Sequence, residues 1–173
     1  EAATEQMVEW LSDGPIAGLY FLPALDPEPG LGTMDLAVWR SELGKRVKTL
    51  YTLMRSLPEN AFLICATRMG GLHGYGPEGA SAPLGGAVTG FAKACAMERS
   101  DTLVKAVDFD ELDDRKVAEH LLEETLRDPG TVEIGYRGGQ RFGIGLVERA
   151  LTSEASAHRP ELDTHTVFLV TGG

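Results

Sequence analysis

Two residues of this sequence, His73 and Asp108, are the candidates for acid–base chemistry. His73 lies in a glycine-rich segment, and Asp108 closes an apolar run. An independent enzyme would use these two residues together with the glycine-rich segment. No Ser or Cys nucleophile lies at a recognisable distance from His73, and the sequence contains no metal-ligand cluster or acid–base pair at a diagnostic spacing. The sequence therefore offers such an enzyme neither a recognisable nucleophile nor a metal site.

The segment from Arg68 to Gly79 is unusually rich in glycine. Glycine allows the backbone to approach phosphate closely, but the spacing here fits neither the G-x-x-x-x-G-K-[ST] loop nor the G-x-G-x-x-G fingerprint. We therefore predict a packed loop without a catalytic role. Its glycines are Gly70, Gly71, Gly74, Gly76 and Gly79.

Four basic residues, Lys45, Arg46, Lys48 and Arg55, crowd one half of a helical pattern over residues 36–54. Phosphate binding is one interpretation of this cluster. Cations near a helix C-terminus also suit the helix dipole, and we predict a solvated helix face instead.

A helix that leads into a buried strand is predicted over residues 81–110, around which the rest of the chain is organised. One stripe of this helix is apolar, and a second stripe consists of small residues that would allow another element to approach closely. An apolar run at residues 103–107 then ends at Asp108. The apolar stripe is Leu84, Val88, Phe91 and Cys95, and the small stripe is Gly86, Gly90 and Ala94.

This stretch resembles the short-chain dehydrogenase/reductase superfamily, whose catalytic helix carries Tyr-x-x-x-Lys and continues through a glycine and an Ala-x-Glu into a strand. Gly90, Ala96, Glu98 and the strand at Val104 match that continuation. The same alignment places Ser81 at the catalytic tyrosine and Gly85 at the catalytic lysine, and Thr67 or Gly70 and Gly71 near the catalytic serine. A reductase needs the phenol and the ammonium, so the pair is erased. No Tyr-x-x-x-Lys occurs anywhere in the chain.

A reductase-like half without its catalytic pair resembles the non-catalytic structural subdomain of a ketoreductase domain in type I polyketide synthases and polyunsaturated-fatty-acid-type synthases. The resemblance covers most of residues 10–173 and leaves the choice between the two synthase types open. It rests on A-T-R-M-G-G-L-H-G-Y-G (66–76), P-L-G-G-A-V-T-G-F (83–91), V-K-A-V-D-F (104–109) and the closing F-L-V-T-G-G.

The resemblance implies a role beside a catalytic half. That half would reduce β-ketoacyl chains on acyl carrier protein with NADPH, and its tyrosine would lie beyond residue 173. Residues 1–173 would contribute no catalytic residue and bind no cofactor alone, and a homodimeric parent synthase is compatible with the resemblance. Thr171, Gly172 and Gly173 would open the glycine turn around the cofactor pyrophosphate.

The resemblance and the hydrophobic pattern together predict a truncated Rossmann-like α/β fold with a mostly parallel sheet flanked by helices. We expect a structural subdomain at 1–149, a linker at 150–165, and a strand and glycine turn at 166–173. Such a sheet ordinarily begins one strand earlier, so we expect an incomplete N-terminal edge. The predicted helices are 3–12, 36–54, the helix that opens the stretch 81–110, and 113–127, whose inward residues are Val117, Ala118, Leu121, Leu122 and Thr125. The predicted strands are 16–22, 61–67 and 103–107, with a loop at 23–33 and a β-hairpin at 131–147.

Composition narrows the class of protein. The 173 residues are 43% hydrophobic and carry a net charge of −10, which argues against nucleic-acid and anionic-membrane partners.

Cys65 and Cys95 lie in apolar patterns, so we predict buried free thiols in a reducing compartment. No signal peptide or run of about 18 apolar residues is found, and we expect a cytoplasmic protein. The start at Glu1 without Met suggests a piece of a longer protein.

One alternative is a stand-alone scaffold or binding module that kept the reductase fold and lost its chemistry. A stand-alone module should have a closed apolar surface, whereas a subdomain that braces a catalytic half should expose a large patch for it.

Overall fold

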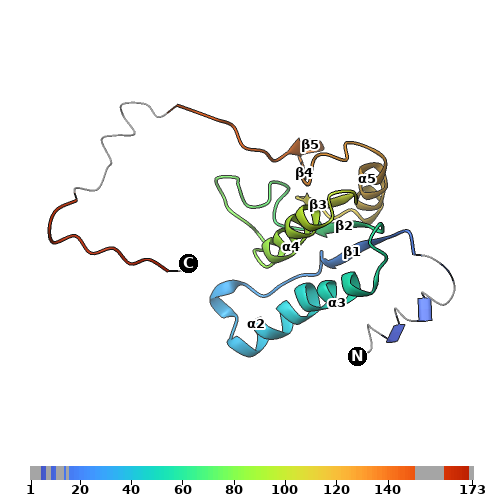
Figure 1. Cartoon of the computed structure of the whole chain (residues 1–173), viewed down its shortest axis with the longest axis horizontal. Coiled ribbons are helices and arrows are strands. Elements are labelled where there is room, and N and C mark those ends of the chain that lie inside the picture. The colour runs from blue at the N-terminus through green and yellow to red at the C-terminus, as the bar shows by residue number, and fades with distance from the viewer. Residues whose placement is uncertain (1–4, 7–8, 11–13, 15, 151–161, 172–173) are drawn as a thin grey trace.

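A five-stranded sheet forms the centre of the computed structural model, which describes residues 5–6, 9–10, 14, 16–150 and 162–171 (Figure 1). The strands follow one another in sequence order, β1-β2-β3-β4-β5. The first four are parallel, and β5 is antiparallel to β4. They are β1 (Gly18–Ala24), β2 (Phe62–Thr67), β3 (Val104–Phe109), β4 (Glu133–Arg137) and β5 (Gln140–Gly143).

Helices cover both faces of this sheet, which confirms the predicted Rossmann-like α/β class. On one face, α3 (Thr49–Ser56) and α4 (Gly85–Glu98) pack against alternate residues of β2 and β3, such as Leu63 and Ala106. On the other face, α5 (Asp114–Leu126) packs against the intervening residues, such as Ile64 and Val107. Two-sided burial explains why β2 and β3 are continuous apolar runs instead of alternating ones.

The predicted helix at 36–54 is one helical segment that contains a wider turn. It consists of α2 (Leu36–Leu43), a π-helical turn η2 (Gly44–Lys48) and α3, and the Asp35 carboxylate caps its first turn by accepting from the Val38 amide at 2.8 Å. Leu36 and Trp39, which belong to the predicted buried stripe, are exposed. The buried stripe begins only near the π turn, because α2 extends beyond the edge of the sheet (Figure 1).

α5 confirms the predicted helix but not all of its predicted inward face. Val117 and Leu121 are buried, whereas Ala118 and Leu122 are exposed. The prediction that Ala118 and Leu122 face inward was wrong, because α5 contacts the sheet along a narrow stripe. That stripe continues from Val117 and Leu121 to Glu124, which is fully buried.

β4 and β5 form the predicted hairpin. Gly138 and Gly139 have φ of 57° and 73°, as a two-residue turn of type I′ requires, and Arg137 pairs with Gln140. β5 ends at Gly143, so the strand is shorter than the range to 147 that alternation predicted.

Several predicted elements lie near the two ends of the chain. β1 forms one edge of the sheet, with no strand beyond it in the described residues, and the expected incomplete N-terminal edge stays a prediction. Residues 5–6 and 9–10 are helical, and the rest of the helix predicted at 3–12 lies outside the described residues. Most of the predicted linker, 151–161, also lies outside them.

The predicted strand at 166–170 is not formed in the structure. These residues have no strand partner, and a strand requires one.

A short helix of 3-10 type, η1 (Leu31–Thr33), lies within the predicted loop at 23–33. Among the described residues, no helix combines the length and apolarity needed to cross a bilayer.

Candidate functional site

The carboxyl ends of the parallel strands bring the two acid–base candidates together. Asp108, near the end of β3, is fully buried, and the glycine loop that follows β2 passes directly over it. The Asp108 carboxylate accepts hydrogen bonds from the Thr67 hydroxyl at 2.7 Å and from the backbone amides of Met69 at 2.6 Å and His73 at 2.9 Å. The contact to His73 is made by its backbone, so Asp108 holds the loop and does not orient the imidazole.

The imidazole of His73 is occupied at both nitrogens. Nε2 lies 2.9 Å from the Ile134 carbonyl oxygen, which can only accept, so Nε2 carries the proton. Nδ1 lies 3.2 Å from the Thr89 hydroxyl and accepts its hydrogen. A ring bonded to the sheet on one side and to α4 on the other has no free nitrogen with which to act as a base.

The glycine loop is packed against β4, backbone to backbone. A Cβ atom built on Gly71 would lie 2.2 Å from the Tyr136 carbonyl oxygen, and one on Gly135 would lie 1.9 Å from the Gly71 carbonyl oxygen. These glycines are therefore needed for a close approach of two protein segments, which agrees with the predicted packed loop.

The sequence resemblance aligns Ser81 and Gly85 with a catalytic tyrosine and lysine, and both residues are engaged in contacts within the fold. The Ser81 hydroxyl donates to the Arg68 carbonyl oxygen at 2.8 Å. Gly85 is buried, and a Cβ atom there would lie 2.9 Å from Cγ of Met69 and 3.2 Å from Cβ of Thr67. The volume into which a lysine would project is filled by the Met69 side chain.

Arg46 overturns part of the prediction for the four basic residues. Lys45, Lys48 and Arg55 are exposed, but Arg46 is 1% exposed and ion-paired with Glu42. Its Nη2 donates to the Asp26 carbonyl oxygen at 3.0 Å, and its Nε lies 3.9 Å from the Glu28 carboxylate.

Glu28 links this buried arginine to α4. Its other carboxylate oxygen accepts from the Leu84 amide, 3.1 Å away, at the residue that precedes α4. Arg46 thus holds the loop that follows β1 against the start of α4. It is buried and ion-paired, so it neither lies on a solvated helix face nor is available to bind phosphate.

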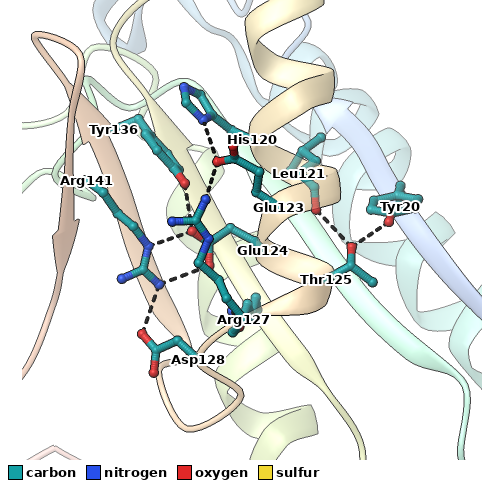
Figure 2. A network of polar contacts seen from close by, with 11 residues as sticks. Tyr20, His120, Leu121, Glu123, Glu124, Thr125, Arg127, Asp128, Tyr136 and Arg141 are labelled. Carbon is teal, nitrogen blue, oxygen red and sulfur yellow. Dashed lines mark hydrogen bonds and ion pairs between the residues drawn. The ribbon is translucent and has the colours of Figure 1, made fainter.

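A buried polar network on the α5 face was missed by sequence reasoning (Figure 2). Lys105 of β3 and Glu124 of α5 are both fully buried, with Nζ 2.8 Å from the Glu124 carboxylate. The same carboxylate accepts from the Tyr136 hydroxyl at 2.7 Å and from Arg141 at 2.6 and 3.0 Å. The signals were a lysine inside the apolar run V-K-A-V and a glutamate seven residues after the buried Val117, on the same helix face.

The network shifts the ionisation of its members. Burial alone would raise the pKa of Glu124, but hydrogen bonds from Arg141, Lys105 and Tyr136 outweigh it and hold that pKa at about 2. Burial, together with the adjacent Glu124 carboxylate, raises the pKa of Tyr136 well above its usual range. Tyr136 is thus a poor proton donor at neutral pH.

Cys65 and Cys95 are buried free thiols, as predicted. Burial raises the pKa of both thiols, so neither is a reactive thiolate at neutral pH. Of the residues predicted to bind cofactor, Thr171 is exposed, and Gly172 and Gly173 lie outside the described residues.

No family model and no curated protein sequence match this chain. Among solved structures it is similar to a metagenomic short-chain oxidoreductase (SDR) in complex with NADP, with a TM-score of 0.55 and 18% sequence identity. The similarity covers 79% of this chain and 68% of that chain. At this identity the similarity establishes the fold alone: the chain has a Rossmann-like α/β fold.

Proposed function

We propose that this chain is the non-catalytic structural part of an NADPH-dependent β-ketoacyl reductase domain in a polyketide or fatty-acid-type multienzyme synthase. It braces a catalytic half of the same polypeptide, which reduces β-ketoacyl chains held on acyl carrier protein in the cytoplasm. NADPH binds to the complete domain, where Thr171, Gly172 and Gly173 open the pyrophosphate turn. The fold of a short-chain oxidoreductase supports the class of this proposal.

The observation that carries the proposal is the occupancy of the catalytic positions. Reductase chemistry needs a tyrosine and a lysine, and this chain has Ser81 bonded to a backbone carbonyl and Gly85 packed against Met69. The remaining acid–base candidates, His73 and Asp108, have their polar atoms engaged within the fold.

The exposed surface supports a bracing role. The small stripe of α4, Gly86, Gly90 and Ala94, is exposed, and Met97 beyond it is 86% exposed. A hollow of about 740 Å³ lies beside this stripe, between Tyr75, Lys93 and residues 143–146. Small residues on a helix let a partner element approach closely, and an exposed apolar patch beside them favours a protein contact.

The apolar segment at 167–170 also supports a further half. Val167, Phe168, Leu169 and Val170 are each at least 70% exposed. Four consecutive exposed apolar residues fit a strand whose sheet is completed by other residues. This surface is the opposite of what a stand-alone scaffold with closed apolar faces would have, so the observations favour the bracing role over that alternative.

Side-chain footprinting with hydroxyl radicals tests the proposal at Met97. We expect its labelling to fall about five-fold or more in a protein extended by one further domain of roughly 250 residues, because the catalytic half covers the α4 face. Leu126 is the matched control, since it is 88% exposed on the opposite face of the sheet and should label equally in both proteins. Equal labelling of Met97 in the two proteins would overturn the docking of a catalytic half on α4.

A further inference from the structure

β5 is attached to the core through one side chain. It is the last strand of the sheet and, among the residues that the structure describes, pairs only with β4. Of its four residues, Gln140, Phe142 and Gly143 are exposed, and Arg141 alone is partly buried. Because exposed side chains contribute little to the position of a strand, Arg141 and the backbone ladder hold β5 in place.

Arg141 makes a two-pronged contact with α5 (Figure 2). Its Nε donates to Oε1 of Glu124 at 2.6 Å and its Nη2 donates to Oε2 at 3.0 Å. Nη2 also donates to the Asp128 carboxylate, 2.9 Å away, in the turn after α5. A bidentate contact between guanidinium and carboxylate fixes orientation as well as distance.

The acceptor of this contact is held by other partners as well. Glu124 is fully buried and also holds Lys105 of β3 and Tyr136 of β4. These two partners remain if Arg141 is removed, so the carboxylate keeps a neutralising cation. Arg141 can therefore be changed without leaving a buried charge unpaired.

The backbone ladder of the hairpin is short and rich in glycine. Four residue pairs join β4 to β5, and Gly135, Gly138, Gly139 and Gly143 all belong to the hairpin. Glycine adds no side-chain packing and leaves the backbone more conformational freedom to lose on folding. A ladder of this kind relies on an additional attachment.

We propose that Arg141 is a latch that fixes β5 against α5, and that it is a positioning residue for the catalytic half. The latch follows from the contacts of Arg141, whereas its effect on the catalytic half rests on the proposed function. β5 continues directly into residues 143–146, which line the hollow beside α4, so loosening β5 displaces one wall of the proposed docking surface.

Hydrogen exchange on Arg141→Met tests the latch, because methionine keeps an apolar stem and removes the charge. We expect the amides of β5 to exchange about ten-fold faster or more, with β2 and β3 unchanged. Arg141→Lys, which restores one charge but not the two-pronged contact, should give an intermediate rate. Arg115→Met is the control, since Arg115 forms an exposed ion pair with Glu119 within α5. Unchanged β5 exchange in Arg141→Met would overturn the latch.

Reductase turnover of the extended protein tests the positioning role. In Arg141→Met we expect kcat to fall several-fold with the KM for NADPH unchanged, and Arg141→Lys to recover part of it. Faster β5 exchange with unchanged kcat would overturn the positioning role. That result would leave the proposed function standing, because the labelling of Met97 tests the docking of the catalytic half independently of Arg141.

Discussion

Glu124 connects three strands of the sheet to a helix through a single carboxylate. Its partners come from β3 (Lys105), β4 (Tyr136) and β5 (Arg141). A buried ion pair adds little over an apolar core of the same volume, but the loss of one partner is costly because the other charge stays buried. The network thus specifies how α5 sits on the sheet more than it adds stability.

Glu124→Gln should destabilise the fold by about 3–5 kcal/mol, because it leaves the Lys105 ammonium buried beside a neutral amide. Glu119→Gln is the matched control on the same helix, where the exposed pair with Arg115 contributes about 0.5 kcal/mol or less. Urea unfolding followed by circular dichroism measures both. A loss of under 1 kcal/mol in Glu124→Gln would show that the network is not needed for stability.

The pKa of Glu124 gives this network a defined pH window. It is about 2 in the folded chain, below the value of about 4.3 for an unfolded glutamate. The depressed pKa contributes stability that is fully present above about pH 4.3 and is lost as the pH falls towards 2, on the order of 3 kcal/mol in all. Between pH 4.5 and 2, the wild-type chain should therefore lose more stability than Glu124→Gln.

Residue type alone did not distinguish chemistry from structure. His73 and Asp108 are the residues that an acid–base mechanism would use, and the fold does bring them together, yet through the His73 backbone amide. The same limit applies to Arg46, whose burial depends on a π-helical turn that the spacing of apolar residues does not reveal. Lys105 and Glu124 were detectable only as charges in apolar positions.

The elements show which interactions the glycine loop depends on. Gly71 combines a positive φ of 79° with contact to the backbone of β4, whereas Gly79 has a φ of 71° and no atom within 4 Å of its Cβ position. The two positions therefore separate the cost of backbone conformation from the cost of packing.

Gly71→Ala should lower stability by about 3 kcal/mol or more, because the added methyl overlaps the Tyr136 carbonyl in addition to the strained φ. Gly79→Ala should cost only about 1 kcal/mol, from the conformation alone. Thermal unfolding measures both, at roughly 2–4 °C per kcal/mol for a chain of this size. Similar Tm values for the two variants would mean that the loop does not pack against β4 as described.

Strands and helices were predictable where burial dictates the pattern. β2 and β3 are buried on both faces and read as apolar runs, and the hairpin follows from two alternating runs joined by Gly138 and Gly139. The prediction failed where an element meets the sheet along only part of its length. Leu36 and Trp39 lie on the part of the helical segment beyond the sheet edge, and Leu122 lies beside the contact line of α5.

At the scale of the whole molecule, the fold and the surface support the same interpretation. The sheet and helices match a short-chain oxidoreductase in architecture, and the sequence resemblance aligns Ser81 and Gly85 with the catalytic tyrosine and lysine of that superfamily. The α4 face and residues 167–170 expose apolar side chains that a closed domain would bury. The small stripe of α4 and the terminal V-F-L-V are visible in the sequence as patterns, whereas their exposure became visible only in the structure.

NADPH titration followed by turnover of a small ketone tests the central claim most directly. The measurement compares this chain with a protein extended by one further domain of roughly 250 residues. The account predicts that only the extended protein binds NADPH and reduces the ketone, because the sequence contains no Tyr-x-x-x-Lys and the polar atoms of His73 and Asp108 are engaged within the fold. Binding of NADPH by residues 1–173 alone, with turnover, would contradict the account and make the loop over Asp108 a catalytic site.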